Sequence, residues 1–149
     1  AELHRLNAQI VHRLPFARVA HLLPAGMGEA AWEAIRPNLE HISEAADWWR
    51  IVTGPVAAPA LEDADRLYLD IAHEIALTID WSEGPWIQLC NAIKANVPSR
   101  KGKALFLPLR QALTGMDHGP DMAALLPLIG RERALERLEA ASRSAGAPS

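Results

Sequence analysis

The sequence predicts an all-α protein, because its apolar residues recur at helical spacing and no segment alternates apolar and polar residues like a strand. Half of the 149 residues are hydrophobic, which is enough for a real core. Prolines and glycines divide the chain into about eight short helices. We expect two small bundles, residues 1–60 and 61–141, and a flexible Ser/Ala/Gly/Pro-rich tail over 142–149.

The first bundle has four predicted helices, over residues 2–14, 15–23, 27–35 and 44–52. Pro15 suits a first helical turn, Pro37 ends the third helix, and Ser43 is expected to be the N-cap of the fourth. Trp48 and Trp49 point about 100° apart on that helix. We therefore expect one of them to pack inward and the other to lie at a domain boundary or a binding surface.

The uncharged segment 53–61, with two prolines and a glycine, is the predicted linker to the second bundle. Helices are expected beyond it over residues 62–79, 85–97, 120–129 and 131–141, with another around the apolar run 104–109. The first of these carries an apolar residue at every fourth position: Leu67, Ile71, Ile75 and Ile79.

The remaining helix boundaries and faces follow from the same rules. Ser82 is expected to cap the helix over 85–97, whose apolar face consists of Trp86, Leu89, Cys90, Ile93 and Val97. Pro120 is expected to begin the next helix. Leu135 and Leu138 should face inward in the last helix, whose alternating Arg and Glu residues should be solvated.

Composition excludes several classes of site. No apolar run approaches the roughly 20 residues of a membrane-spanning helix. The single cysteine, Cys90, excludes an internal disulfide and any multi-cysteine zinc site, fits a reducing cytoplasm, and is interpreted as a small buried hydrophobe. The six histidines have no metal-ligand spacing, so no metal site is expected.

The net charge of −3 conceals a basic segment between Ser99 and Met122. Its four cations, Arg100, Lys101, Lys103 and Arg110, precede its first acidic residue. They flank an apolar helix that is followed by a glycine-containing turn. This arrangement suits a site that holds a phosphodiester backbone and presents polar groups to bases.

The motifs in this part of the chain resemble the C-terminal signature of bacterial glutamyl-tRNA synthetases, which are class I enzymes. They are Gly102-Lys103, Pro108-Leu109-Arg110, Ala112-Leu113-Thr114-Gly115, Gly119-Pro120 and Gly130-Arg131-Glu132-Arg133. The likeness is strong after Trp81 and weaker before it, where Asn7 and Ala8 match. It implies two helical anticodon-binding domains of the α-helix cage type.

The resemblance assigns roles by position. Arg110 matches the arginine that contacts the middle anticodon base, while Gly119, Pro120 and Met122 match the turn against which the first anticodon bases pack. Thr114 is expected to share a helix face with Arg110. A planar guanidinium suits base recognition by stacking and hydrogen bonding.

Contacts to the tRNA phosphates are expected from Arg100, Lys101 and Lys103. At the position where discriminating members of the family carry an arginine that reads the third anticodon base, this sequence has Asn38, with Arg36 two residues earlier. An enzyme without that arginine is expected to accept both tRNA(Glu) and tRNA(Gln).

The family's HIGH-like and KMSKS-like motifs are missing from this sequence, so no catalytic residue is assigned. The chain begins at Ala1 with helical sequence already under way, which suggests a piece of a longer protein. The parent would attach glutamate to tRNA using ATP with Mg in its catalytic domain, which is then a partner of this region. We expect the piece alone to be inactive, without a cofactor, and monomeric because no heptad repeat is visible.

Two alternatives remain open at this point. One is a helical protein-interaction module that docks through the tryptophans and the Leu125–Leu128 region without binding RNA. The other is a small all-α enzyme that uses His73 with Glu74, or Asp117 with His118. Adjacent residues on a helix diverge, which makes the geometry of either pair poor for catalysis.

Overall fold

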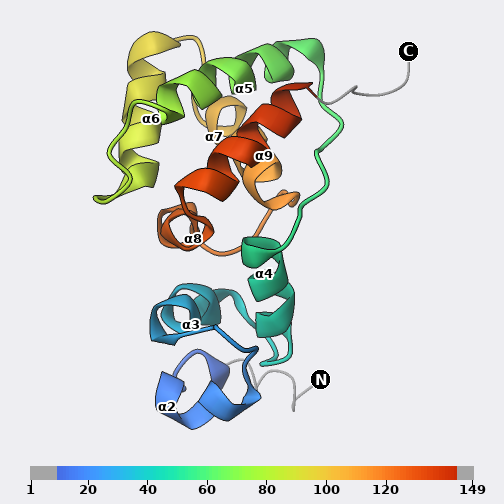
Figure 1. The fold of residues 1–149 in the computed structure, drawn as a ribbon, viewed down its shortest axis with the longest axis vertical. Coiled ribbons are helices and arrows are strands. Elements are labelled where there is room, and N and C mark those ends of the chain that lie inside the picture. The colour runs from blue at the N-terminus through green and yellow to red at the C-terminus, as the bar shows by residue number, and fades with distance from the viewer. Residues whose placement is uncertain (1–9, 144–149) are drawn as a thin grey trace.

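The protein is all-α in the computed structural model, which describes residues 10–143 (Figure 1). Within that range there are eight α-helices, two short 3₁₀ helices and no strand. The predicted fold class is therefore confirmed. Most of the predicted helix over 2–14 lies outside the described residues. At its end, Val11 is buried whereas Ile10 is exposed.

The first half of the chain folds into short helices. They are α2 (Phe16–Val19), η1 (Ala20–Leu22), α3 (Glu29–Ile35), η2 (Arg36–Asn38) and α4 (Glu44–Thr53). Ser43 lies at the N-cap of α4 as expected, but its side chain accepts no capping hydrogen bond. Instead Glu44 Oε1 accepts from the backbone N–H groups of Glu40 and His41, at 2.8 and 2.6 Å.

The second half contains longer helices. They are α5 (Asp63–Ala76), α6 (Pro85–Asn96), α7 (Lys103–Thr114), α8 (Met122–Ile129) and α9 (Arg131–Arg143). The segment between α4 and α5 is not helical, as predicted. The last helix is longer than expected, because Ser142 and Arg143, assigned to the tail, still belong to it. The rest of the predicted tail lies outside the described residues.

The two halves share one core. In Figure 1, α4 and α3 stand below α8, and both helices contact α8, while α5 packs along α9. The buried apolar residues form a continuous cluster that runs from Val11 in the first half to Ala141 in the second. The boundary at residue 60 stays a prediction. What the contacts establish is that α8 packs against both halves.

Two helix starts differ from the prediction. Ser82 is not the cap of α6, because its backbone N–H and hydroxyl both bond to the Asp80 carboxylate, at 2.9 and 2.6 Å. The N-cap is Gly84, whose φ of +53° favours glycine, and Pro85 follows at the first helical position. Helix α8 begins at Met122 rather than Pro120, because the Asp121 carboxylate caps it by accepting from Ala123 N.

The apolar repeat that predicted α5 is only partly its buried face: Ile75 and Ile79 pack, partly buried, against the core, and Ile79 lies beyond the end of α5. Leu67 and Ile71 are 68% and 42% exposed. The buried positions are Tyr68, Leu69, Ala72 and Ala76. The small side chains of the two alanines allow close helix packing, and the Tyr68 hydroxyl is satisfied because it donates to the Leu105 carbonyl at 2.8 Å. Tertiary contacts therefore select a face that the strongest apolar repeat marks only in part.

The predicted face of α6 is confirmed, since Leu89, Cys90 and Ile93 are buried. Burial raises the pKa of the Cys90 thiol to about 11, although nearby Lys94 opposes the shift. The thiol therefore stays protonated near neutral pH, as expected of a cysteine that packs as a small hydrophobe. Of the paired tryptophans, Trp48 is the buried one and Trp49 is partly exposed.

Helix α9 buries Leu135 and Leu138 as predicted, but the expectation that all its charged residues are solvated is wrong at Arg137. That side chain is 8% exposed. Its guanidinium donates to carbonyls on three segments: Leu113 at 2.8 Å, Ile51 at 2.8 Å, Val52 at 3.0 Å and Gly54 at 2.7 Å. Burial lowers the pKa of Arg137, and neighbouring Arg133 lowers it further.

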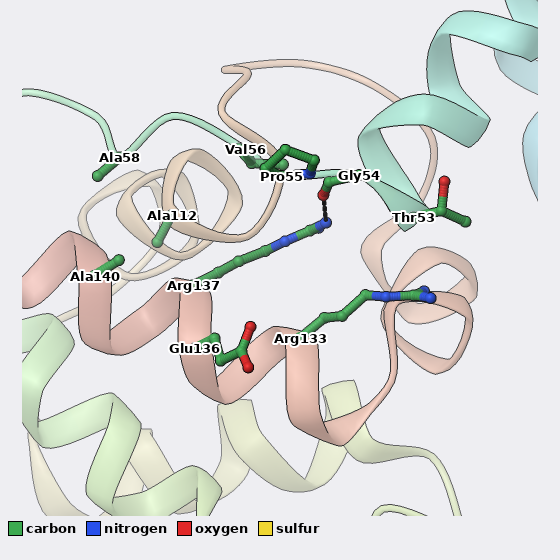
Figure 2. Close-up of a pocket in the computed structure, with 10 residues that line it drawn as sticks. All are labelled: Thr53, Gly54, Pro55, Val56, Ala58, Ala112, Arg133, Glu136, Arg137 and Ala140. Atoms are coloured by element: carbon green, nitrogen blue, oxygen red, sulfur yellow. Dashed lines mark hydrogen bonds between the residues drawn. The ribbon is translucent and has the colours of Figure 1, made fainter.

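Figure 2 shows Arg137 extending from α9 toward the linker, where it bonds to Gly54. The pocket around it measures about 410 Å³ and contains none of the predicted site residues in its lining. Arg137 thus fastens the end of α4 and the linker to α7 and α9.

We predict that Arg137→Met lowers the free energy of unfolding by roughly 2–5 kcal/mol, because buried carbonyls lose their donor. Chemical denaturation followed by circular dichroism measures the change. Arg143→Met is the matched control: Arg143 lies on the same helix in an exposed ion pair with Glu139, and its loss should cost less than about 1 kcal/mol. Equal effects of the two substitutions would contradict the fastening role of Arg137.

Candidate nucleic-acid interface

The predicted basic segment forms α7 and the turn that follows it. On α7, Lys103 and Arg110 lie seven residues apart, two helical turns along one side. Lys103 is exposed and Arg110 is partly buried. The helix ends at Gly115, whose φ of +75° allows the chain to reverse.

Thr114 holds the exit of α7. Its hydroxyl donates to the Arg110 carbonyl at 2.8 Å and accepts from the backbone N–H of Met116 at 3.0 Å. The side chain is only 2% exposed. Thr114 therefore adjoins Arg110 as expected, but its hydroxyl is engaged in shaping the turn.

Arg110 is anchored to that turn. Its Nη1 donates to the Pro120 carbonyl at 3.0 Å. Its other guanidinium nitrogens have no hydrogen-bond partner within residues 10–143. Partial burial lowers the pKa of Arg110, and the nearby Asp121 carboxylate opposes the shift, so the group remains cationic at neutral pH. The result is a fixed planar fork with unused donors.

The 119–122 turn exposes the side chain of Asp121 but buries those of Pro120 and Met122. The Met122 side chain is 2% exposed. Gly119 has φ +145°, and a Cβ at this position would come within 2.3 Å of Trp48 Cη2. A base that packs here would therefore meet the backbone of the turn, which only glycine allows to lie against the Trp48 ring.

Trp48 is a supporting residue that the sequence did not assign to the site. Its ring belongs to α4, packs under Gly119 and stands edge-on to the His118 ring, with 6.4 Å between the ring centroids. Helix α4 of the first half thus sets the position of a turn in the second half. In the sequence, the only signal for this role was the tryptophan pair on a predicted helix. Such a pair does not indicate which residues Trp48 contacts.

The three cations predicted to contact phosphates fall into two groups. Lys101 and Lys103 are exposed and form no ion pair in the described part of the chain. Arg100 is already engaged: it pairs with Asp65 at 2.6 Å, donates to Ala104 O, and lies 4.4 Å from the Tyr68 ring centroid. The ammonium groups of the two lysines remain available to contact phosphates, whereas Arg100 holds α5 against the start of α7.

The two candidates for reading the third anticodon base also differ. Arg36 donates to the Leu14 carbonyl at 2.7 Å and pairs with Glu33 at 2.8 Å. Asn38 is exposed, and its side chain has no hydrogen-bond partner among the described residues. The asparagine amide is therefore available to a ligand, while the arginine stabilises its own half of the protein.

Neither of the two residue pairs considered for the alternative, a small all-α enzyme, forms an enclosed site. His73 Nδ1 lies 3.8 Å from the Glu74 carboxylate, which is 70% exposed. His118 Nδ1 lies 2.8 Å from Asp117, and both side chains are exposed. The hydrogen bond with His118 lowers the pKa of Asp117, and Lys103 contributes to the same shift.

Residues 10–143 contain no cluster of three or more histidine, cysteine or carboxylate side chains with the arrangement of a metal site. None of the helices described is both long and apolar enough to cross a bilayer.

An anchored arginine, a backbone turn and unpaired lysines on a helical scaffold define a domain suited to single-stranded RNA. Residues 29–142 match the family of anticodon binding domains, and the chain belongs to this family. It is 66% identical over 140 residues to "Glutamate--tRNA ligase 1" of Novosphingobium aromaticivorans. It is 60% identical over 141 residues to the protein of that name from Rhizorhabdus wittichii and 53% over 141 residues to that from Zymomonas mobilis.

These matches cover 94%, 95% and 95% of the chain, but only 31%, 31% and 32% of the respective relatives. The chain thus corresponds to about a third of the length of the ligases that it resembles.

We predict that Gly119→Ala destabilises the fold by roughly 2–4 kcal/mol, because the new methyl group would overlap the Trp48 ring and the backbone conformation is costly for alanine. Thermal unfolding followed by tryptophan fluorescence measures the effect. Gly28→Ala is the control, since a Cβ there meets nothing within 4 Å. A near-neutral Gly119→Ala would contradict the close packing of the turn on Trp48.

Proposed function

We propose that this chain is the anticodon-binding part of a glutamate–tRNA ligase and that it binds the anticodon loop of tRNA(Glu). The observation that carries the proposal is Arg110, whose guanidinium is tied to the Pro120 carbonyl while its remaining donors have no partner within the described residues. A donor fork held in advance can bond to a base edge without first being ordered. The family match and the ligase relatives support this assignment.

In this proposal the middle anticodon base meets Arg110, and the first bases pack against the 119–122 turn. Because the Pro120 and Met122 side chains are buried, the backbone and the exposed Asp121 side chain remain to make that contact. Bases in an unpaired loop expose both their faces and their Watson–Crick edges, which suits recognition by one arginine and a rigid turn. Lys101 and Lys103 bind phosphates and so orient the loop without reading it.

Asn38 supports relaxed discrimination at the third anticodon base. That base is C in glutamate tRNAs and G in glutamine tRNAs, as the genetic code requires. On the Watson–Crick edge C presents two acceptors, N3 and O2, whereas G presents two donors, N1–H and N2–H₂. An arginine that reads this edge has only donors and therefore favours C over G. An asparagine amide has both a donor and an acceptor and can bond to either base. We therefore propose that tRNA(Gln) is also accepted.

The ligase reaction belongs, in this proposal, to a catalytic domain of the longer protein. That domain would use ATP with Mg to activate glutamate and attach it to the tRNA held here. Residues 10–143 contribute recognition and positioning, and we expect them to be monomeric and inactive by themselves. The proposed location is the cytoplasm, where translation takes place.

The interaction-module alternative is weakened by burial. Leu125 and Leu126 are fully buried, and Trp48 is 7% exposed, so the apolar residues expected to dock a partner are mostly in the core. The enzyme alternative is weakened by exposure, since Asp117 and His118 lie on the open surface. Neither alternative accounts for the free donors of Arg110.

We predict that Arg110→Ala weakens binding of a tRNA(Glu) anticodon stem-loop about 10- to 100-fold, because the base loses charge-assisted hydrogen bonds. Fluorescence anisotropy titrations at low and moderate salt measure the affinity. Binding by the unaltered chain should weaken as salt rises, owing to the phosphate contacts.

Arg143→Ala serves as the control for charge, because Arg143 is exposed and lies outside the proposed site. Unchanged affinity in Arg110→Ala, with the variant folded, would rule out Arg110 as the base reader. Equal losses in both variants would indicate attraction by net charge alone.

We predict that Asn38→Arg makes the chain discriminate between the two tRNAs. The ratio of affinities for glutamate and glutamine stem-loops should rise about 10-fold, because a donor-only side chain that faces the Watson–Crick edge of the third base favours C over G. Parallel titrations of both loops measure the ratio. Asn38→Asp, which removes the donor and keeps the shape, is the comparison variant. A ratio that Asn38→Arg leaves unchanged would show that residue 38 does not face the third base.

A further inference from the structure

An aromatic and cationic cluster lies beside the proposed anticodon site and has no role in it so far. Phe106 on α7 is 39% exposed although it belongs to a helix that faces the core on its other side. Its ring lies 6.2 Å from the Trp86 ring of α6, tilted by 37°. The ammonium of Lys94, also on α6, lies over the Phe106 ring at 5.7 Å from its centroid.

The cluster is continuous with the proposed site through the geometry of α7. Phe106 precedes Arg110 by four residues and follows Lys103 by three, so the three side chains form one stripe on the helix. An aromatic ring therefore lies between a phosphate-binding cation and the base reader. The buried residues Leu105, Leu109 and Ala112 occupy the opposite side of the helix.

The charge around this ring is positive. Lys94, Lys101 and Lys103 are exposed and have no ion-pair partner in the part of the chain that the structure describes. Two acidic groups interact with the stripe by charge: Asp117 with Lys103, and Asp121 with Arg110. An exposed ring beside lysines that form no ion pair is a combination that binds single-stranded nucleic acids.

The exposed apolar residues of α5 provide a contrast. Leu67 is 68% exposed, but it lies in a groove with Asp63, Arg66, Asp70 and Ser142, and no aromatic residue lines that groove. The single cation of this groove, Arg66, is already paired with Asp63. Carboxylates would repel a phosphate backbone. The surfaces at Leu67 and at Phe106 thus both expose apolar side chains. Of the two, only the surface at Phe106 combines an aromatic ring with cations suited to RNA binding.

We propose that Phe106, with Trp86 and Lys94, forms a stacking site for one further unpaired nucleotide of the same RNA loop, next to the anticodon. This inference rests on the proposed function. Trp86 supports the Phe106 ring from α6 and limits its motion. In the free protein the Lys94 ammonium lies over the Phe106 ring, at 5.7 Å from its centroid. On RNA binding the ammonium moves to the phosphate of the incoming nucleotide, and the base stacks on the ring face that it leaves.

The test uses tRNA(Glu) anticodon stem-loops that carry 2-aminopurine at one loop position outside the anticodon at a time. One position should lose fluorescence when the unaltered chain binds, because its base stacks on Phe106. Phe106→Leu should abolish that quenching and weaken binding about 5- to 100-fold, the range for loss of one stacked base. Phe106→Trp should preserve both.

Two further variants separate stacking from other effects. Lys94→Gln should reduce the slope of log affinity against log salt by about one, as expected for a single lost phosphate contact. Leu67→Ala should change nothing, since Leu67 is an exposed apolar residue in a groove that has no aromatic residue in its lining. Circular dichroism melting of every variant verifies that it is folded.

The outcomes distinguish this site from the proposed function. If Phe106→Leu binds and quenches like the unaltered chain while Arg110→Ala loses affinity, the stacking site is overturned and the proposed function stands. If the unaltered chain binds no loop, both are overturned. If Phe106→Leu instead changes the oligomeric state in sedimentation experiments and leaves RNA binding intact, the patch joins two copies of the chain and the stacking proposal is wrong.

Discussion

The arrangement of this domain depends on the burial of one guanidinium. Arg137 cannot leave water unless its donors are satisfied, and among residues 10–143 the groups that satisfy them are main-chain carbonyls from α4, the linker and α7. These carbonyls lie at helix ends or in non-helical chain, where intrahelical donors are missing. The guanidinium thus supplies the donors that these carbonyls lack, and the carbonyls supply the acceptors that the guanidinium needs. The linker, whose composition suggests freedom, is held in place by this exchange.

Fastening α4 has a direct consequence for the interface. Trp48 lies on α4, its ring packs against Gly119, and the next residue, Pro120, accepts the hydrogen bond that orients Arg110. A side chain from the first half of the protein therefore shapes the turn of the second half that we propose binds the anticodon. The proposed reader is rigid because its support comes from the shared core, and a rigid donor loses less conformational entropy on binding.

The cations of this chain fall into two groups: those already bonded within the protein and those whose donors remain available. Arg36, Arg100 and Arg137 are satisfied by carbonyls or carboxylates within the protein. Arg110 and the lysines at positions 94, 101 and 103 keep donors available on the α6–α7 side. A net charge of −3 is compatible with RNA binding under this division, because the local field near the interface is set by a few unpaired cations. Sequence position alone does not reveal which arginines are already engaged.

The sequence by itself determined the helical class, the non-helical linker, the buried face of α6 and the segment that holds the candidate site. These features follow from local rules of period, proline geometry and charge clustering, and the family resemblance added Arg110 and the Gly119-Pro120 turn. The tertiary structure alone decided that α5 leaves Leu67 and Ile71 of its apolar repeat exposed, that Gly84 rather than Ser82 caps α6, and that Arg137 is a core residue. The reason is that satisfaction of a buried polar group depends on distant segments: Arg137 and Gly54 are 83 residues apart, and no local pattern records their meeting.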